Sequence, residues 1–157
     1  MSITISIQKF LNVKFHEHKI LRKDFINESG IKRSSISELL NGIPVSPSLV
    51  TILKIANYFN CSIDEILGRV DYMQDDSTKY IKISPVQMSN NTKDFIVSML
   101  KENNISSHQL AASCNIGTDT INYFIKKHDS KKNLSTRTIY AVANFFNISI
   151  DKIVGRI

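Results

Sequence analysis

The chain has 157 residues, of which 42% are hydrophobic and 22% charged, and it carries a formal net charge of +6. This composition is typical of a soluble globular protein and excludes a disordered chain. No run approaches the roughly 18 consecutive apolar residues of a membrane span, and the first residues lack the pattern of a secretory signal. We therefore expect a cytoplasmic protein that is not bound to a membrane.

Apolar residues at helical spacing predict five short helices between residues 1 and 70. Gly30 ends the second helix, because glycine accepts the left-handed conformation found at helix C-termini. Ile36 is expected to face inward from the third helix, and Ser46 or Ser48 to cap the fourth. The expected helices are a first one that ends before residue 16, followed by 21–30, 32–42, 49–59 and 62–68.

A linker is expected over residues 71–91, because Pro85 and clustered Asp, Ser and Asn residues interrupt the helical period. Apolar and polar residues alternate over residues 78–86, which leaves a short strand open as an alternative. A solvated linker is the favoured interpretation. The two domains then span residues 1–70 and 92–157.

The second domain repeats the order of the first. The segment IANYFNCSIDEILGRV (55–70) aligns without gaps to VANFFNISIDKIVGRI (142–157), with ten of sixteen residues identical. The offset is 87 residues here and 85 further upstream, so two extra residues lie in the polar stretch KKHDSKKNLS. The expected helices of the second domain are 92–103, 107–115, 117–127, 136–146 and 149–155.

Basic residues outnumber acidic ones in both domains but not between them. The net charge is +3 over residues 1–70, −1 over 71–91 and +4 over 92–157. Two basic blocks are typical of two units that face a polyanion, although many ordinary domains are equally basic.

Two segments carry a resemblance to a known family: ILRKDFINESGIKRSSISELLNGIPVSPSLVTILKIANYFNCSIDEILG and ISSHQLAASCNIGTDTINYFIKKHDSKKNLSTRTIYAVANFFNISIDKIVG. Both resemble the lambda-repressor/Cro-like, or XRE, helix-turn-helix transcriptional regulators. The resemblance implies an all-α fold of two tandem five-helix DNA-binding domains. Three positions depart from the family pattern: Arg22 and Ser107 replace its usual Gln, and Asn115 replaces its turn glycine.

In this family the third helix enters the major groove of double-stranded DNA, and flanking cations contact phosphates. Arg33 is the strongest candidate for a contact to guanine. In the first domain the implied DNA-binding residues are Arg22, Lys32, Arg33, Ser34, Ser35, Ser37 and Glu38. In the second they are Ser107, Thr118, Asp119, Thr120, Asn122, Tyr123, Lys126, Lys127, Lys131, Lys132 and Arg137.

The resemblance also suggests how the copies are paired. The two domains could form a pseudo-dimer that reads two unlike half-sites and replaces the homodimer of simpler relatives. Apolar residues of the fifth helices could join the copies or could complete each domain's own core, and the sequence leaves both open. A homodimer with one active domain per chain is the other arrangement.

Two other classes of function are a protein-binding module and an enzyme. A degenerate second domain could be a protein-binding module, such as an antitoxin or an inhibitor of a mobile element, because its third helix is acidic and poor in Lys and Arg. An enzyme is not expected, since His16, His18, His108 and His128 form no metal or acid–base motif. Cys61 and Cys114 lie far apart, so neither a metal nor a cofactor is expected.

Overall fold

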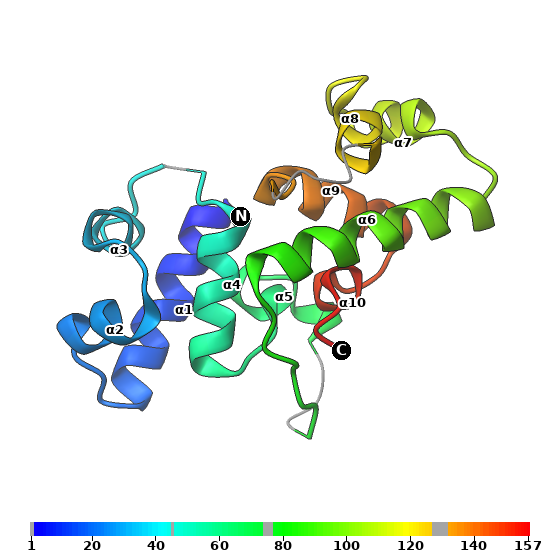
Figure 1. The fold of residues 1–157 in the computed structure, drawn as a ribbon. Helices are drawn as coiled ribbons and strands as arrows, with labels where there is room; N and C mark the ends of the chain where they lie inside the picture. The colour runs from blue at the N-terminus through cyan, green and yellow to red at the C-terminus, as the bar shows by residue number, and fades with distance from the viewer. Residues whose placement is uncertain (1, 45, 74–76, 127–131) are drawn as a thin grey trace. The chain divides into compact units, whose positions relative to one another are not determined.

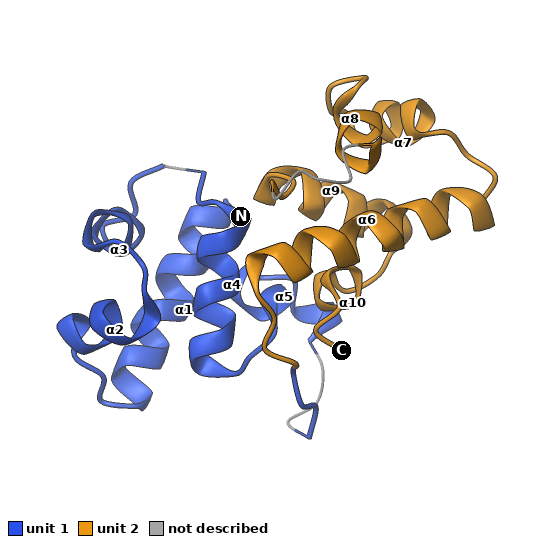
Figure 2. Ribbon diagram, viewed as in Figure 1, with its two compact units in different colours: residues 1–80 blue, residues 81–157 orange. Residues whose placement is uncertain are grey.

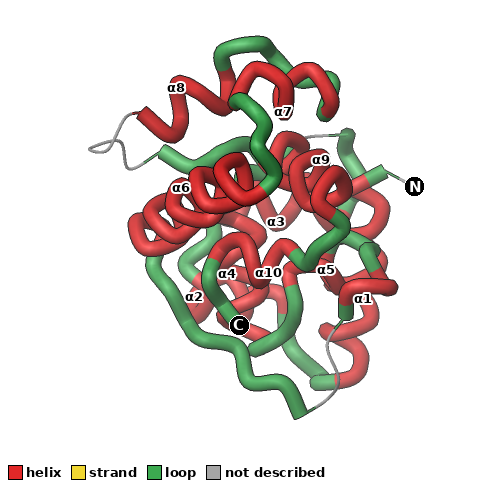
Figure 3. The backbone as a smooth tube through the Cα atoms, turned by 90° about the vertical axis from the view of Figure 1, so that its right-hand side faces the viewer, coloured by secondary structure: helices red, strands yellow, loops and turns green. Residues whose placement is uncertain are grey.

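The computed structural model describes residues 2–44, 46–73, 77–126 and 132–157, and in these ranges it contains helices and loops but no strand (Figures 1 and 3). The all-α class predicted from the sequence is therefore confirmed for the described part. The chain divides into two compact units, unit 1 at residues 1–80 and unit 2 at residues 81–157 (Figure 2). None of the helices described is both long and apolar enough to cross a membrane.

Unit 1 is built around α1 and α4, whose apolar faces are buried. α1 packs against α3 and α5, and α4 packs against α2 and α5. Leu11, Phe25, Ile36 and Ile52 are fully buried at these contacts. The helices of unit 1 are α1 (Ile3–Glu17), α2 (Arg22–Ser29), α3 (Arg33–Leu40), α4 (Leu49–Phe59) and α5 (Ile63–Ile66), followed by the 3-10 helix η1 (Val70–Tyr72).

Unit 2 is built around the longest of the described helices, α6. α6 packs against α8 and α10, while α7 packs against α8 and α9 against α10 (Figure 1). Ile96, Leu110, Ile121 and Ile139 are fully buried. The helices of unit 2 are α6 (Pro85–Glu102), α7 (Ser107–Ser113), α8 (Thr120–Lys126), α9 (Thr136–Phe146) and α10 (Ile150–Val154).

The linker expected over residues 71–91 is wrong for its last seven residues, 85–91, because α6 begins at Pro85. Ser84 caps α6: its Oγ accepts from the Gln87 N–H at 3.1 Å, and the Gln87 side chain accepts from the Ser84 N–H at 2.7 Å. A proline at the first helical position lacks only an N–H that would have no partner within the helix, so Pro85 begins the helix rather than interrupting it. The alternative strand over 78–86 is absent.

Left-handed backbone recurs at matched positions of the two units. Four pairs have positive φ when aligned by the offsets of 85 and 87 residues: Lys19 and Asn104 (51° and 52°), Gly30 and Asn115 (73° and 55°), Asn60 and Asn147 (51° and 56°), Gly68 and Gly155 (77° and 81°). Asn tolerates this conformation better than most residues, so Asn115 keeps the turn that glycine forms in unit 1.

A buried ion pair joins the fifth helix of each unit to the segment after it. In unit 1, Arg69 donates to Asp64. In unit 2, Arg156 Nη1 donates to Asp151 Oδ1 at 2.5 Å. All four side chains are buried. Neither pair was predicted from the sequence, although Asp and Arg recur five residues apart in both copies.

The fifth helices pack within their own units. α5 contacts α1 and α4, and α10 contacts α6 and α9. The apolar residues of the fifth helices therefore contribute to the cores of their own units, as the second of the two interpretations expects. The residues that end the matched segments remain open to solvent, since Val70 is 66% exposed and Ile157 is 42% exposed.

We predict that Asp151→Asn destabilises unit 2 by about 3–5 kcal/mol, because it leaves the buried guanidinium of Arg156 without a counter-charge. Chemical denaturation followed by circular dichroism measures the loss. The control is Asp94→Asn on the exposed side of α6, which should change the free energy of unfolding by less than about 0.5 kcal/mol. Equal effects of the two substitutions would contradict a structural role for the pair.

Candidate nucleic-acid interface

A tight turn joins α2 to α3 in unit 1. Gly30 ends α2 at φ 73°, where most side chains would be strained. The Ile31 N–H donates to Ser29 Oγ at 3.3 Å, and Ile31 is buried. Because α3 begins at Arg33, this turn determines where the first residues of α3 lie.

The buried side of α3 determines which of its residues face solvent. Ile36, Leu39 and Leu40 point into the core. At 100° per residue, this setting points Ser34 and Glu38 away from the core. Lys32 and Arg33 lie at the N-terminal end of the helix, before its first buried residue. Lys32, Arg33 and Ser34 are exposed as expected, whereas Ser35, Ser37 and Glu38 are half-buried and lie at the margin of the surface.

The far end of α3 is held by α1. Gln8 Nε2 donates to the carbonyl oxygen of Leu40 at 2.9 Å. This side chain satisfies one of the carbonyl groups that a helix leaves without a partner at its C-terminus. A methyl group added to Gly42, which has φ 66°, would lie 3.0 Å from Gln8 Oε1. The chain therefore leaves α3 close against α1.

Two polar side chains of α4 contact the end of α2. Lys54 Nζ donates to the Gly30 carbonyl at 3.2 Å, and the Tyr58 hydroxyl donates to Glu28 Oε2 at 2.8 Å. Burial and the hydrogen bond to Glu28 raise the pKa of Tyr58 above its ordinary value. The sequence analysis missed both contacts, whose partners are 24 and 30 residues apart.

Basic residues lie at the N-termini of α2 and α3. Arg22 and Lys23 begin α2, Lys32 and Arg33 begin α3, and all four are exposed. Neither Leu21 nor Lys32, the residues at the two N-cap positions, accepts a hydrogen bond from its helix through a side chain. Helix N-termini with neighbouring cations favour phosphate groups. This surface of unit 1 can therefore bind an anionic backbone.

The corresponding surface of unit 2 has different chemistry. Ile121 and Phe124 are buried, whereas Thr118, Asp119 and Thr120 are exposed. Tyr123 is also exposed, at 59%, and Asn122 is half-buried. His108 Nε2 lies 3.3 Å from Asp119 Oδ1, a contact between α7 and the start of α8 that the sequence analysis missed.

The remaining residues expected in unit 2 are partly outside the described residues. Lys126, Lys132 and Arg137 are exposed and Ser107 is half-buried. Lys127 and Lys131 fall in the undescribed stretch 127–131. The loop that leads to α9 is attached to α6, since Ser89 Oγ donates to the Lys132 carbonyl at 2.9 Å and Asn133 Nδ2 to the Pro85 carbonyl at 3.1 Å.

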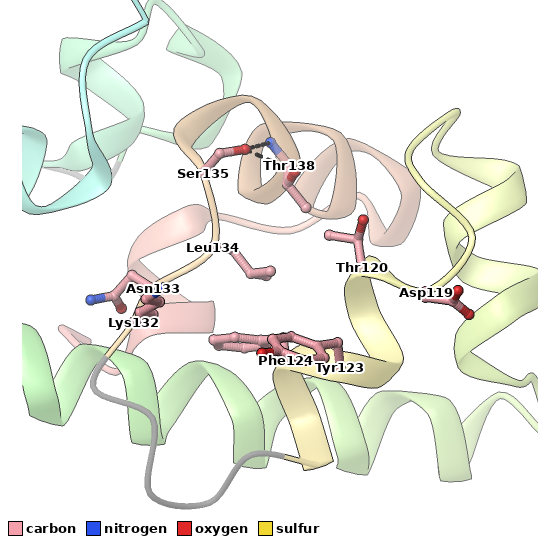
Figure 4. Close-up of a pocket in the computed structure, with 9 residues that line it drawn as sticks. All are labelled: Asp119, Thr120, Tyr123, Phe124, Lys132, Asn133, Leu134, Ser135 and Thr138. Atoms are coloured by element: carbon pink, nitrogen blue, oxygen red, sulfur yellow. Dashed lines mark hydrogen bonds between the residues drawn. The ribbon is translucent and has the colours of Figure 1, made fainter.

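A pocket of about 460 Å³ lies between α8 and the start of α9 (Figure 4). Phe124 and Leu134, both buried, form much of its apolar wall. The pocket brings Lys132 to the same depression as three residues of the α8 surface. Its lining residues are Asp119, Thr120, Tyr123, Phe124, Lys132, Asn133, Leu134, Ser135 and Thr138.

Metal binding and thiol chemistry have little support in the described ranges. They contain no group of three or more His, Cys, Asp or Glu side chains that could hold a metal ion. Cys61 and Cys114 are not joined in a disulfide. Burial raises the pKa of the Cys114 thiol, which disfavours the reactive thiolate.

We predict that Gly30→Ala lowers the free energy of unfolding by about 1–2 kcal/mol. No atom lies within 4 Å of a Cβ at this position, so the cost comes from the left-handed backbone alone. Gly30→Asn should cost less, because Asn115 adopts φ 55° at the matched position of unit 2. Thermal and urea unfolding measure both; a larger loss for Asn than for Ala would contradict this account.

Comparison with known proteins identifies unit 1. A profile described as a Cro/C1-type HTH DNA-binding domain matches residues 11–71, from within α1 to η1. An uncharacterized HTH-type transcriptional regulator of Rickettsia prowazekii (strain Madrid E) is 33% identical over 72 residues, which cover 44% of this chain and 78% of that protein.

A second such regulator, from Rickettsia conorii (strain ATCC VR-613 / Malish 7), is also 33% identical over 72 residues, which cover 44% of this chain and 66% of that protein. No solved structure matches significantly. The helix-turn-helix geometry of α2 and α3 agrees with the matched profile. The chain therefore belongs to the Cro/C1-type helix-turn-helix family of transcriptional regulators, with its DNA-binding domain in unit 1.

Proposed function

We propose that this protein is a sequence-specific transcriptional repressor that inserts α3 into the major groove of double-stranded DNA. The exposed basic start of α3 above the fully buried Ile36 is the observation that carries the proposal. Arg33 then reads guanine, because its guanidinium can donate two hydrogen bonds to the O6 and N7 atoms of that base. Bound at an operator, the protein blocks transcription.

Phosphate contacts orient α3 in this proposal. Arg22 and Lys32 lie at helix N-termini and are exposed. Cations at such positions bind the DNA backbone and carry no sequence information. Ser34 is short and exposed, so it allows the helix to approach the base edges closely.

Unit 2 is a second, divergent helix-turn-helix domain in the same proposal. Support comes from the aligned sequence repeat, the matched left-handed residues and the recurrence of the buried Asp–Arg pair. Thr120 and Asn122 of α8 would read bases, and Lys126, Lys132 and Arg137 would contact phosphates. The chain then reads two unlike half-sites without needing a second copy.

A protein partner is the second candidate for unit 2. The exposed carboxylate of Asp119 repels phosphates, and the neighbouring pocket has an apolar wall of Phe124 and Leu134. Protein interfaces commonly place an aromatic or aliphatic side chain in such a pocket. In this case unit 1 binds DNA alone and unit 2 binds a partner, with Tyr123 at the contact.

We predict different effects for two substitutions that each remove one positive charge. Arg33→Gln should lower affinity for the preferred sequence by about 1–3 kcal/mol and relax specificity at one base pair. Arg22→Gln should weaken binding to all sequences equally and lower the slope of log affinity against log salt by about one. Electrophoretic mobility shifts at several salt concentrations measure both; indistinguishable profiles would contradict these roles.

We predict that random-site selection with the full chain returns an asymmetric operator. Its half-site centres should lie about 34–36 Å apart, or a multiple of this, because each reading helix needs the same side of the duplex. One chain should bind each selected duplex, as measured by sedimentation. A perfect palindrome bound by two chains would instead show that the protein acts as a homodimer with one reading domain per chain.

Binding by unit 2 has its own test. Asp119→Ala should change the sequence preference at the second half-site if α8 reads DNA. If unit 2 binds a protein instead, this substitution leaves the selected sequence unchanged, while Arg33→Ala still relaxes the preference of unit 1 at one base pair.

A further inference from the structure

We propose that Lys54 and Tyr58 are positioning residues, which hold the α2–α3 turn of unit 1 in the geometry that reads DNA. We call these two residues and their partners, Gly30 and Glu28, the α4 clamp. This inference rests on the proposed function of α3 as the reading helix. It gives a positioning role to two residues that lie outside the reading surface.

The first half of the clamp acts on the last residue of the α2 turn. Lys54 Nζ donates to the Gly30 carbonyl at 3.2 Å. Gly30 is the C-cap of α2, where carbonyl groups lack partners within the helix and the helix dipole is negative. A cationic donor is favourable there. The contact therefore restrains the residue at which the chain leaves α2.

The second half of the clamp is the contact made by Tyr58, which lies one helical turn after Lys54 on α4. The Tyr58 hydroxyl donates to Glu28 Oε2 at 2.8 Å, and Lys54 and Tyr58, four residues apart, lie on the same face of α4. The Tyr58 ring packs edge-on against Phe25, with centroids 4.9 Å apart. Both contacts hold the last turn of α2 against α4.

Because of its position, the clamp affects how well α3 discriminates between DNA sequences and not only how stably unit 1 folds. Lys32 and Arg33 follow Gly30 by two and three residues, so the clamp fixes the near end of α3. Gln8 fixes the far end through the Leu40 carbonyl. Because base contacts need side chains placed to a fraction of an ångström, loss of the near restraint reduces discrimination between sequences before it reduces binding to phosphates.

Unit 2 does not repeat the clamp chemistry. Ala141 and Phe145 stand at the positions matched to Lys54 and Tyr58, and Ser113 stands at that of Glu28. Neither Ala nor Phe can donate a side-chain hydrogen bond. Instead, Cys114 Sγ lies 3.7 Å from the Ala141 carbonyl, a weak contact, and a capping box of Ser106 and Gln109 stabilises the opposite end of α7. The clamp therefore belongs to unit 1.

Tyr58→Phe tests the clamp most cleanly, because it removes the hydroxyl and keeps the ring that packs on Phe25. The probes are the duplex selected by the wild-type chain and a scrambled duplex of equal length and composition. We expect about 2- to 10-fold weaker binding to the selected duplex, unchanged binding to the scrambled one, and faster hydrogen exchange over residues 28–33. Phe145→Tyr, the mirror substitution in unit 2, is the control and should change none of these.

Two further variants separate positioning from other roles. Glu28→Ala should reproduce the effect of Tyr58→Phe, and the double variant should be no weaker than either one, because both remove the same hydrogen bond. Lys54→Met should also lose discrimination without a change in salt dependence, and Lys54→Arg should restore it. If Lys54 contacted phosphate instead, Lys54→Met would weaken both duplexes and lower the salt slope by about one.

The inference is overturned if Tyr58→Phe and Lys54→Met leave the ratio of the two affinities unchanged while the wild-type chain discriminates between the duplexes. It is also overturned if both affinities fall together with the melting temperature, since that shows a purely structural role. If the wild-type chain itself does not discriminate, the proposed reading function fails, and this outcome is distinct from the other two.

Discussion

The complete burial of one isoleucine in each third helix is the constraint on which the candidate interface depends. Ile36 in α3 and Ile121 in α8 are both fully buried, and protein cores are packed too densely for either helix to turn about its axis without loss. The neighbours of each isoleucine therefore keep a fixed order around the helix. Arg33 in one unit and Thr118 in the other lie three residues before the isoleucine, at or just before the N-terminal end of the third helix, and both are exposed there.

The two units share helix caps and a buried ion pair, but they differ in the side chains that their third helices expose. Serine caps begin the fourth and fifth helices of both, and an Asp–Arg pair is buried beside each fifth helix. The surface of α3 is basic and rich in hydroxyl groups, while that of α8 is neutral to acidic and lies next to a pocket. We infer that the core has been kept while the exposed residues have diverged, which suits one principal reader and one partner with a different target.

Local signals in the sequence predicted much of this fold, and contacts between distant residues account for most of what they missed. Gly30 ends α2 as expected, and Ser48, one of the two serines expected there, caps α4, because capping depends on a few neighbouring residues. Pro85 was misread because proline is found both in loops and at the first position of a helix. The capping box of Ser84 and Gln87 on either side of it distinguishes the helix from a loop.

In the candidate site, too, local sequence signals predicted some features, and contacts between distant residues account for those that were missed. Helical periodicity accounts for the exposed Ser34 on α3, whereas Lys32 and Arg33 are exposed because they lie at the N-terminal end of the helix. Three other expected contacts, Ser35, Ser37 and Glu38, are half-buried, because packing of α3 against α1 covers more of its surface than periodicity alone implies. Lys54 and Gln8 reach the site from α4 and α1, and no local pattern marks side chains that contact a backbone carbonyl so far along the chain.

Guanine methylation interference tests the central claim most directly. Methylation at N7 blocks an acceptor that is accessible only from the major groove. With the operator selected by the full chain, we expect that N7 methylation at one or two guanines of the half-site read by unit 1 prevents binding, whereas methylation outside the two half-sites has no effect. Binding that is insensitive to N7 methylation at every guanine of a guanine-containing operator would contradict reading of the major groove by α3.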